Sequence, residues 1–286
     1  MATHPESRRR DGQPGDPPPD GNPPPDTRSR QPTSKVPALR PGQRYAAEFL
    51  GTALLVLFHA GAAASLRLAL NADHTLKSAP DVLYLGVADG FALFLIIMIV
   101  GKVSGVLINP AVTLGLASAG RFPRNDVAPY LVAEFAGAIF GAFGVLLIFG
   151  DKGASIGHVG AASLGSGVGL IQGLCIEALG AFILVLTISA TAEDPRSPSG
   201  WAGLAIGLTL GTIVMLMEPA TGASVNPARA FGPDLVATFA GLDVNWLDYL
   251  VVYLVGPIVG GVLSAHLYRY LAGQPATKPA PPGGGS

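Results

Sequence analysis

Charged residues are scarce in this 286-residue chain. Asp, Glu, Lys and Arg together make up 13% of it, whereas soluble domains carry about 25%. Hydrophobic residues make up 49%, and the mean hydropathy is +0.46. The formal net charge of −1 leaves no basic excess, so we expect no nucleic-acid partner. The few charges gather in the terminal segments and between long apolar runs, which indicates an integral protein of the lipid bilayer.

Cysteine is almost absent, since Cys175 is the only one. A single cysteine excludes an internal disulfide and a cysteine-based metal site. The histidines of the apolar runs and loops show no metal-ligand spacing and are interpreted as structural: His59, His74, His158 and His266. We therefore expect neither a metal nor a cofactor.

The two ends of the chain lack large apolar residues and cannot bury enough surface to fold. Residues 1–43, rich in Pro and Arg, and residues 272–286, rich in Pro and Gly, are predicted to be disordered tails. An excess of Arg and Lys marks the cytoplasmic side of a membrane protein. The basic residues that six membrane crossings place on the side of the N-terminus are Arg121, Arg124, Arg196 and Arg269. This distribution predicts a multi-pass protein of the cell membrane with both termini in the cytoplasm.

Six apolar runs between these tails are long enough to cross a bilayer, which takes ~20 helical residues. They are predicted near residues 44–70, 82–102, 126–150, 170–191, 201–217 and 246–271. The folded domain is accordingly predicted to cover residues 44–271.

The tripeptide Asn-Pro-Ala occurs twice, as Asn109, Pro110 and Ala111 and again as Asn226, Pro227 and Ala228. Asn is a preferred N-cap of helices, and Pro suits the first helical position because it has no N–H to leave unpaired. The segments that follow, residues 112–119 and 229–237, are compatible with helix but too short to span a membrane.

The two halves of the chain resemble each other. Residues 47–51 (AEFLG) and 176–180 (IEALG) begin repeats that we place at about 44–150 and 170–271. Each repeat has three spans and one short helix, and because three is odd, the second repeat is inverted in the membrane. Inverted repeats place a shared site near the midplane, so we expect the two short helices to meet there by their N-termini.

Two facing helix N-termini create a positive centre, because each carries roughly half a unit charge. Amide donors of Asn109 and Asn226 would serve a neutral solute with an oxygen lone pair, whereas a cation would be repelled. Arg229 follows the second motif, and an arginine at membrane depth usually faces a cavity. Glu48 and Glu177, at matching repeat positions, are predicted to accept N–H bonds from the irregular backbone that leads into each short helix.

These features resemble the aquaporin, or major intrinsic protein, family. The two family signatures correspond to residues 104–113 and 222–229, and the resemblance extends over residues 44–271. It implies an all-α membrane fold with six transmembrane helices and two re-entrant half-helices. It also implies a homotetramer in which each subunit has its own pore.

The resemblance further implies a selectivity filter formed by Asp89, Val214, Ala223 and Arg229. The set has no aromatic ring, and its small residues imply an opening wider than a strict water filter. Two readings of Asp89 remain open at this point: a carboxylate in the pore that pairs with Arg229, or a structural group that faces a neighbouring helix.

The predicted function is a passive channel for water and small neutral solutes such as glycerol, which excludes ions and protons. Such a channel performs no covalent chemistry, so we expect no enzyme activity. The alternatives are an ion- or proton-conducting channel or transporter that uses Asp89 and the intramembrane Glu residues, and a non-conducting membrane scaffold.

Overall fold

The computed structural model describes residues 39–70 and 78–273. The predicted tails therefore lie outside the described residues, except for residues 39–43 and 272–273. In the described part, six helices are long and apolar enough to cross a membrane. They are α1 (Pro41–Ala69), α2 (Ala79–Ser104), α4 (Arg124–Phe149), α6 (Leu170–Thr191), α7 (Ala202–Thr221) and a last span, Trp246–Ala272.

The last span is built from three segments: α9 (Trp246–Asp248), a π-helical stretch η3 (Tyr249–Val255) and α10 (Gly256–Ala272). Two shorter helices begin at the repeated tripeptides, α3 (Pro110–Ser118) and α8 (Pro227–Phe239). A helical turn α5 (Asp151–Ser155) and a 3-10 turn η2 (His158–Gly160) connect the two halves. The described residues contain no strand, which confirms the predicted all-α fold.

The helix boundaries lie close to those predicted, with one larger difference at α7. This helix was expected to end near residue 217 but continues to Thr221. It ends at Gly222, whose φ of 74° is in the left-handed region that favours glycine. Pro219 lies inside the last turn of this helix. The Ala220 carbonyl of that turn accepts a hydrogen bond from the Gly165 N–H at 2.8 Å.

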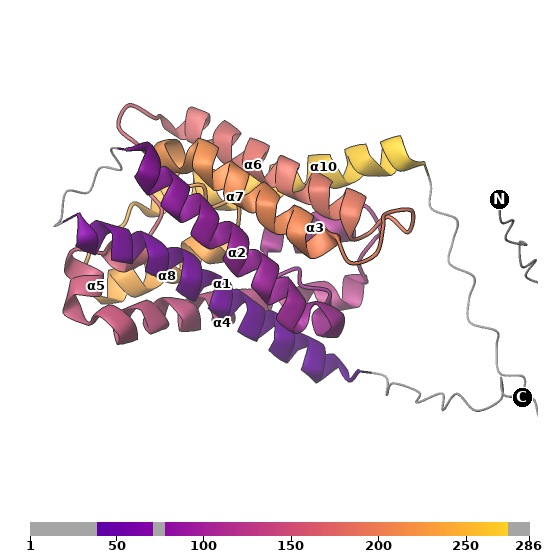
Figure 1. Cartoon of the computed structure of the whole chain (residues 1–286), viewed down its shortest axis with the longest axis horizontal. Coiled ribbons are helices and arrows are strands. Elements are labelled where there is room, and N and C mark those ends of the chain that lie inside the picture. The colour runs from indigo at the N-terminus through magenta and orange to yellow at the C-terminus, as the bar shows by residue number, and fades with distance from the viewer. Residues whose placement is uncertain (1–38, 71–77, 274–286) are drawn as a thin grey trace, which may run out of the picture. The chain divides into compact units, whose positions relative to one another are not determined.

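The helix pairs show the inverted repeat directly. Helix α1 packs against α4 and α2, and in the second half α6 packs against α10 and α7. Each short helix packs against the last span of the other half: α3 against α10, and α8 against α4. In Figure 1, α1 and α4 lie on one side and α6 and α10 on the other, with α2 and α7 between them. Each helix pair of the first half thus has an equivalent pair in the second half. The two halves are related by a pseudo-two-fold axis that passes between α2 and α7.

Glycines allow α2 and α7 to approach closely at this axis. A Cβ atom at Gly207 would lie 2.6 Å from the Gly90 carbonyl oxygen, and a Cβ at Gly90 would lie 2.9 Å from the Gly207 carbonyl oxygen. Gly211 stands in the same relation to Gly86. Small residues at such crossings let helix backbones pack directly against each other.

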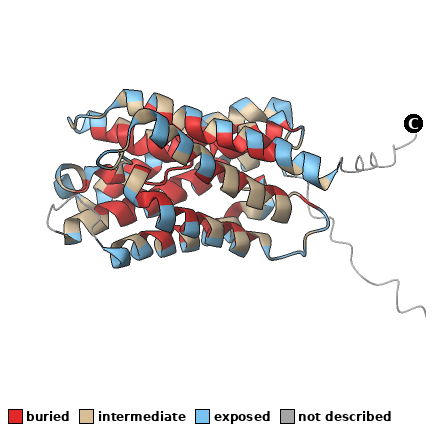
Figure 2. Ribbon diagram, turned by 90° about the horizontal axis from the view of Figure 1, so that it is seen from above, coloured by how far each residue is buried: buried red, intermediate tan, exposed pale blue. Residues whose placement is uncertain are grey.

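Buried residues lie on the inner faces of the long helices and over most of α3 and α8 (Figure 2). Large exposed apolar side chains lie on the outer faces, for example Phe91, Val132, Leu147 and Leu216. The outer apolar surface matches a hydrocarbon environment, and the two short helices are enclosed by protein as irregular backbone at membrane depth requires.

We expect Gly207→Ala to destabilise the bundle by about 1–3 kcal/mol, because a backbone oxygen occupies the position of the new methyl group. Thermal unfolding of the detergent-solubilised protein measures the loss. The matched control is Gly61→Ala in α1, where no atom lies within 4 Å of the added Cβ. Equal melting temperatures for the two variants would contradict the close approach of α2 and α7.

Candidate functional site

The two short helices begin at the centre of the bundle with the same cap. Asn109 Oδ1 accepts a hydrogen bond from the Ala111 N–H at 2.9 Å. Asn226 Oδ1 accepts from the Ala228 N–H at 3.0 Å and from the Arg229 N–H at 3.2 Å. Both side chains act as N-caps, as predicted from the sequence.

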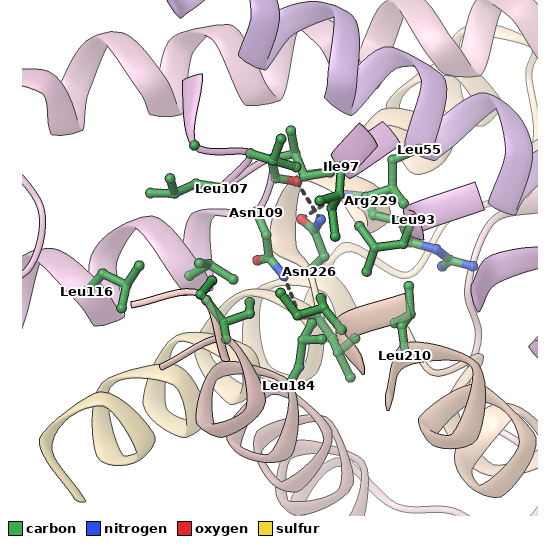
Figure 3. A pocket seen from close by; sticks show the side chains of 18 of the residues that line it. Leu55, Leu93, Ile97, Leu107, Asn109, Leu116, Leu184, Leu210, Asn226 and Arg229 are labelled. Carbon is green, nitrogen blue, oxygen red and sulfur yellow. Dashed lines mark hydrogen bonds between the residues drawn. The ribbon is translucent and has the colours of Figure 1, made fainter. Parts of the chain in front are cut away.

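The same two side chains join the half-helices to each other. Asn109 Nδ2 donates to the Val225 carbonyl at 3.0 Å, and Asn226 Nδ2 donates to the Ile108 carbonyl at 2.9 Å (Figure 3). The two N-termini therefore meet, as the inverted repeat predicted. Because an amide group has two N–H donors, this reciprocal bond uses one of each pair. One N–H per asparagine therefore remains for a solute. The sequence analysis had left both N–H groups of each side chain available to it.

A buried carboxylate supports the backbone in front of each half-helix. Glu48 accepts from the Leu107 and Ile108 N–H groups at 3.1 and 2.6 Å. Glu177 accepts from the Ser224 and Val225 N–H groups at 3.0 and 2.6 Å. Both carboxylates are fully buried, and they occupy equivalent places in the two repeats.

These carboxylates hold a strained backbone. Four non-glycine residues before the half-helices have positive φ: Val106, Ile108, Ala223 and Val225, at 53°, 41°, 40° and 45°. Each such conformation costs on the order of 1–3 kcal/mol and persists only when its surroundings fix it. The strain turns successive backbone N–H groups toward each carboxylate, and it leaves the carbonyls of Ile108 and Val225 directed at the opposite asparagine.

A narrow cavity of about 90 Å³ runs along this centre. Its wall is mainly apolar, with Leu55, Leu93, Ile97, Leu116, Leu184 and Leu210 among its residues (Figure 3). The polar side chains on the same wall include His59, Asn109, Asn226 and Arg229. The volume has room for several water molecules, each of which needs about 10–15 Å³ by this measure.

Arg229 also lines a second cavity of about 370 Å³, so it is common to the walls of both cavities. Arg67 and Glu218 face this second cavity as well. The guanidinium of Arg229 is 2% exposed, and its Nε and Nη1 have no hydrogen-bond partner among the described residues. Two free donors thus lie where the two cavities adjoin.

The other predicted filter residues lie behind this wall. Val214 and Ala223 are fully buried, and neither is among the residues that line the cavities around Arg229. Asp89 is 1% exposed, and its Oδ2 lies 2.7 Å from Nδ1 of His59. One reading of the sequence had paired Asp89 with Arg229. Among the described residues, its close contact is instead with His59 of α1.

His59 is the residue that the sequence reasoning missed. It was interpreted as structural because it has no metal-ligand spacing, yet its ring lies on the cavity wall. The available signal was a titratable side chain inside an apolar span, which usually faces a cavity or a partner. Asp89, a titratable side chain in the next apolar span, was a second indication of such a partner.

The comparisons with known proteins agree with this geometry. The model of the family "Major intrinsic protein" matches residues 35–268. Aquaporin AqpM of Methanothermobacter thermautotrophicus is 42% identical over 246 residues, which cover 81% of this chain and 98% of the relative. Aquaporin TIP2-1 of Arabidopsis thaliana is 37% identical and covers 78% of this chain and 85% of its own length. The X-ray structure of the aquaglyceroporin from Plasmodium falciparum superposes with a TM-score of 0.70 at 25% identity, covering 82% of this chain and 97% of that one.

Six membrane-spanning helices around two half-helices that meet at a narrow cavity define a multi-pass membrane channel. The chain belongs to the major intrinsic protein family. As a member of this family it is a channel for water or small solutes and not an enzyme.

We expect Glu177→Gln to destabilise the protein by about 1.5–3 kcal/mol, since an amide offers only one acceptor oxygen to the two N–H groups that the carboxylate now accepts. Its NH₂ group would oppose one of these N–H donors. Thermal unfolding in detergent measures the effect, with Asp151→Asn on exposed α5 as the control. A melting temperature equal to that of the control would show that the Glu177 bonds carry no stability.

Proposed function

We propose that this channel passively conducts water and small neutral solutes such as glycerol, and that it excludes ions and protons. The observation that carries the proposal is the reciprocal pair of hydrogen bonds at two facing helix N-termini, from Asn109 to the Val225 carbonyl and from Asn226 to the Ile108 carbonyl. The partial positive charges of these N-termini add where the cavity is narrow. A cation there meets repulsion as well as loss of hydration, whereas a neutral solute loses only hydrogen bonds that the site can replace.

Proton exclusion follows from the direction of the donors. The remaining N–H of each asparagine donates, so a water between them accepts with its oxygen and directs its own hydrogens away from the centre. A chain of waters is then oriented in opposite senses on the two sides, which interrupts a proton relay. The dipoles of half-helices in aquaporin-type pores are a known electrostatic barrier of this kind.

Arg229 is the predicted filter residue that we retain as pore-lining. Its free Nε and Nη1 donors would bind a solute oxygen where the two cavities adjoin, and its charge adds to the barrier against cations. We propose that Val214 and Ala223 contribute to the filter from behind the wall, as small residues that leave the lumen open. Asp89 acts on the filter through His59.

A solute larger than water is supported by the apolar wall. Leucine and isoleucine side chains on most sides of the cavity suit the carbon skeleton of a polyol, while Asn109, Asn226 and Arg229 suit its hydroxyl groups. The structural relative named an aquaglyceroporin is consistent with this choice. Glu48 and Glu177 have no part in conduction in this proposal, because backbone N–H groups occupy both oxygens of each carboxylate.

We also propose that both termini are cytoplasmic and that the protein is a homotetramer of the cell membrane. The basic residues predicted for the cytoplasmic side lie at one end of the bundle, where Arg121 donates to the Glu193 carbonyl at 3.5 Å and Arg269 to the Ala119 carbonyl at 3.3 Å. Such a concentration of arginine supports a cytoplasmic location for that end. The tetramer rests on the family resemblance alone.

Proteoliposomes test the conduction proposal. We expect them to shrink in a sucrose gradient and to reswell in a glycerol gradient faster than empty vesicles, with no current in a planar bilayer above the background. Currents without faster shrinkage would favour the ion-conducting alternative, and neither response would favour the scaffold.

We expect Arg229→Ala to admit protons or small cations and to raise glycerol flux several-fold, because the variant removes a charge and a side chain from the wall that both cavities share. A pH-sensitive dye trapped in the vesicles reports the proton leak. Arg124→Ala, at an exposed position of α4, is the control. Equal proton leaks for the two variants would show that Arg229 is not part of the cation barrier.

A further inference from the structure

Asp89 is a buried carboxyl group without a well-formed hydrogen bond. Its two carboxylate oxygens are buried and have no hydrogen-bond partner in the described residues. The imidazole of His59 lies beside it, with Nδ1 at 2.7 Å but off the ideal hydrogen-bond direction. An ionised carboxylate without a partner is costly to bury, so Asp89 requires His59 as a donor. A small rotation of the ring would make this contact a charge-assisted hydrogen bond.

The same ring belongs to the pore. His59 lines the narrow cavity together with Asn109, Asn226 and Arg229, while Asp89 does not line it. The two ring nitrogens of histidine lie on different edges, and the bond made by one sets the tautomer of the other. With Nδ1–H committed to Asp89, a neutral His59 keeps Nε2 as a hydrogen-bond acceptor. That acceptor is available to the cavity, where the free groups of Asn109, Asn226 and Arg229 are donors.

Other charged side chains lie on the elements packed around the Asp89–His59 pair. They are Glu218 on α7, Arg229 on α8 and Arg67 on α1 itself. On α4, which also packs against α1, the buried Glu134 instead accepts from Thr113 Oγ1 at 2.6 Å, at the first half-helix. The Asp89–His59 pair therefore belongs to one cluster of charged and polar side chains near Arg229.

We infer that His59 is a specificity-determining residue of this pore and that Asp89 is its positioning residue. The inference rests on the proposed conduction of neutral solutes. Arg229 supplies donors and His59 supplies an acceptor, so the junction favours solutes whose hydroxyl groups both accept and donate, such as water and polyols. The ring also fills part of the lumen, which limits the width of the solute.

The first test compares His59→Phe and His59→Ala with Leu55→Ala, which lies one helical turn away on the same cavity wall. Phe keeps the bulk but removes the acceptor, so we expect water permeability to fall roughly two- to tenfold, the value of one hydrogen bond. Ala removes the bulk as well, so we expect the glycerol-to-water permeability ratio to rise several-fold. Stopped-flow light scattering of proteoliposomes measures both quantities.

A double-mutant cycle separates positioning by Asp89 from a merely structural role. Asp89→Asn removes the carboxylate that orients the His59 ring, so we expect its water permeability to fall toward that of His59→Phe. Adding Asp89→Asn to His59→Phe should then cause no further fall, because the group that Asp89 positions is already absent. Additive losses from the two substitutions would contradict the positioning role.

Each outcome has a distinct meaning. If wild-type vesicles conduct but His59→Phe has the same water permeability as the wild type, the assignment of His59 is wrong while the proposed function stands. If wild-type vesicles shrink no faster than empty ones, the proposed function itself fails. Gel filtration in detergent verifies folding, and if Asp89→Asn does not fold, His59→Phe and Leu55→Ala still decide the role of His59.

Discussion

The rest of the structure depends on the two hydrogen bonds that Asn109 and Asn226 donate, one each, to the backbone before the opposite half-helix. Each side chain caps its own half-helix with its oxygen and bonds the opposite loop with its nitrogen. Two abbreviated helices could not remain at membrane depth without such partners, because lipid offers no substitute for water. The bond also fixes the orientation of the donors that a passing solute meets.

Several features of the bundle serve this contact. Glu48 and Glu177 hold the strained backbone that directs the Ile108 and Val225 carbonyls across the centre. Close packing of α2 on α7 brings the two repeats together. Around the centre, an apolar wall leaves Asn109, Asn226, His59 and Arg229 among the polar side chains that face the cavity. A solute therefore meets few polar groups. The charge of each group, and whether it donates or accepts a hydrogen bond, accordingly influences which solutes pass.

Most of the fold was predictable from the sequence, because the signals were local or repeated. Apolar runs indicated the six spans, and the two Asn-Pro-Ala motifs indicated both half-helices and their caps. The odd number of spans per repeat predicted the inversion. The further course of α7 to Thr221 was not predictable, since it depends on partners in a distant loop.

The candidate site was less accessible to sequence reasoning. Spacing from the motifs located the backbone position of Asp89 but not the direction of its side chain, which pairs with His59 of another helix. A contact between α1 and α2 leaves no local pattern, so neither residue alone revealed it. The two titratable groups in adjacent apolar spans were a hint of pairing, because a buried charge requires a partner.

A cryo-EM map of the protein in lipid nanodiscs, at a resolution that shows ordered water, tests the central claim most directly. The account predicts a single file of water density through the narrow cavity, with one water within hydrogen-bond distance of both Asn109 Nδ2 and Asn226 Nδ2. Separate half-helix N-termini, or asparagines closed off from any continuous file of water, would contradict it.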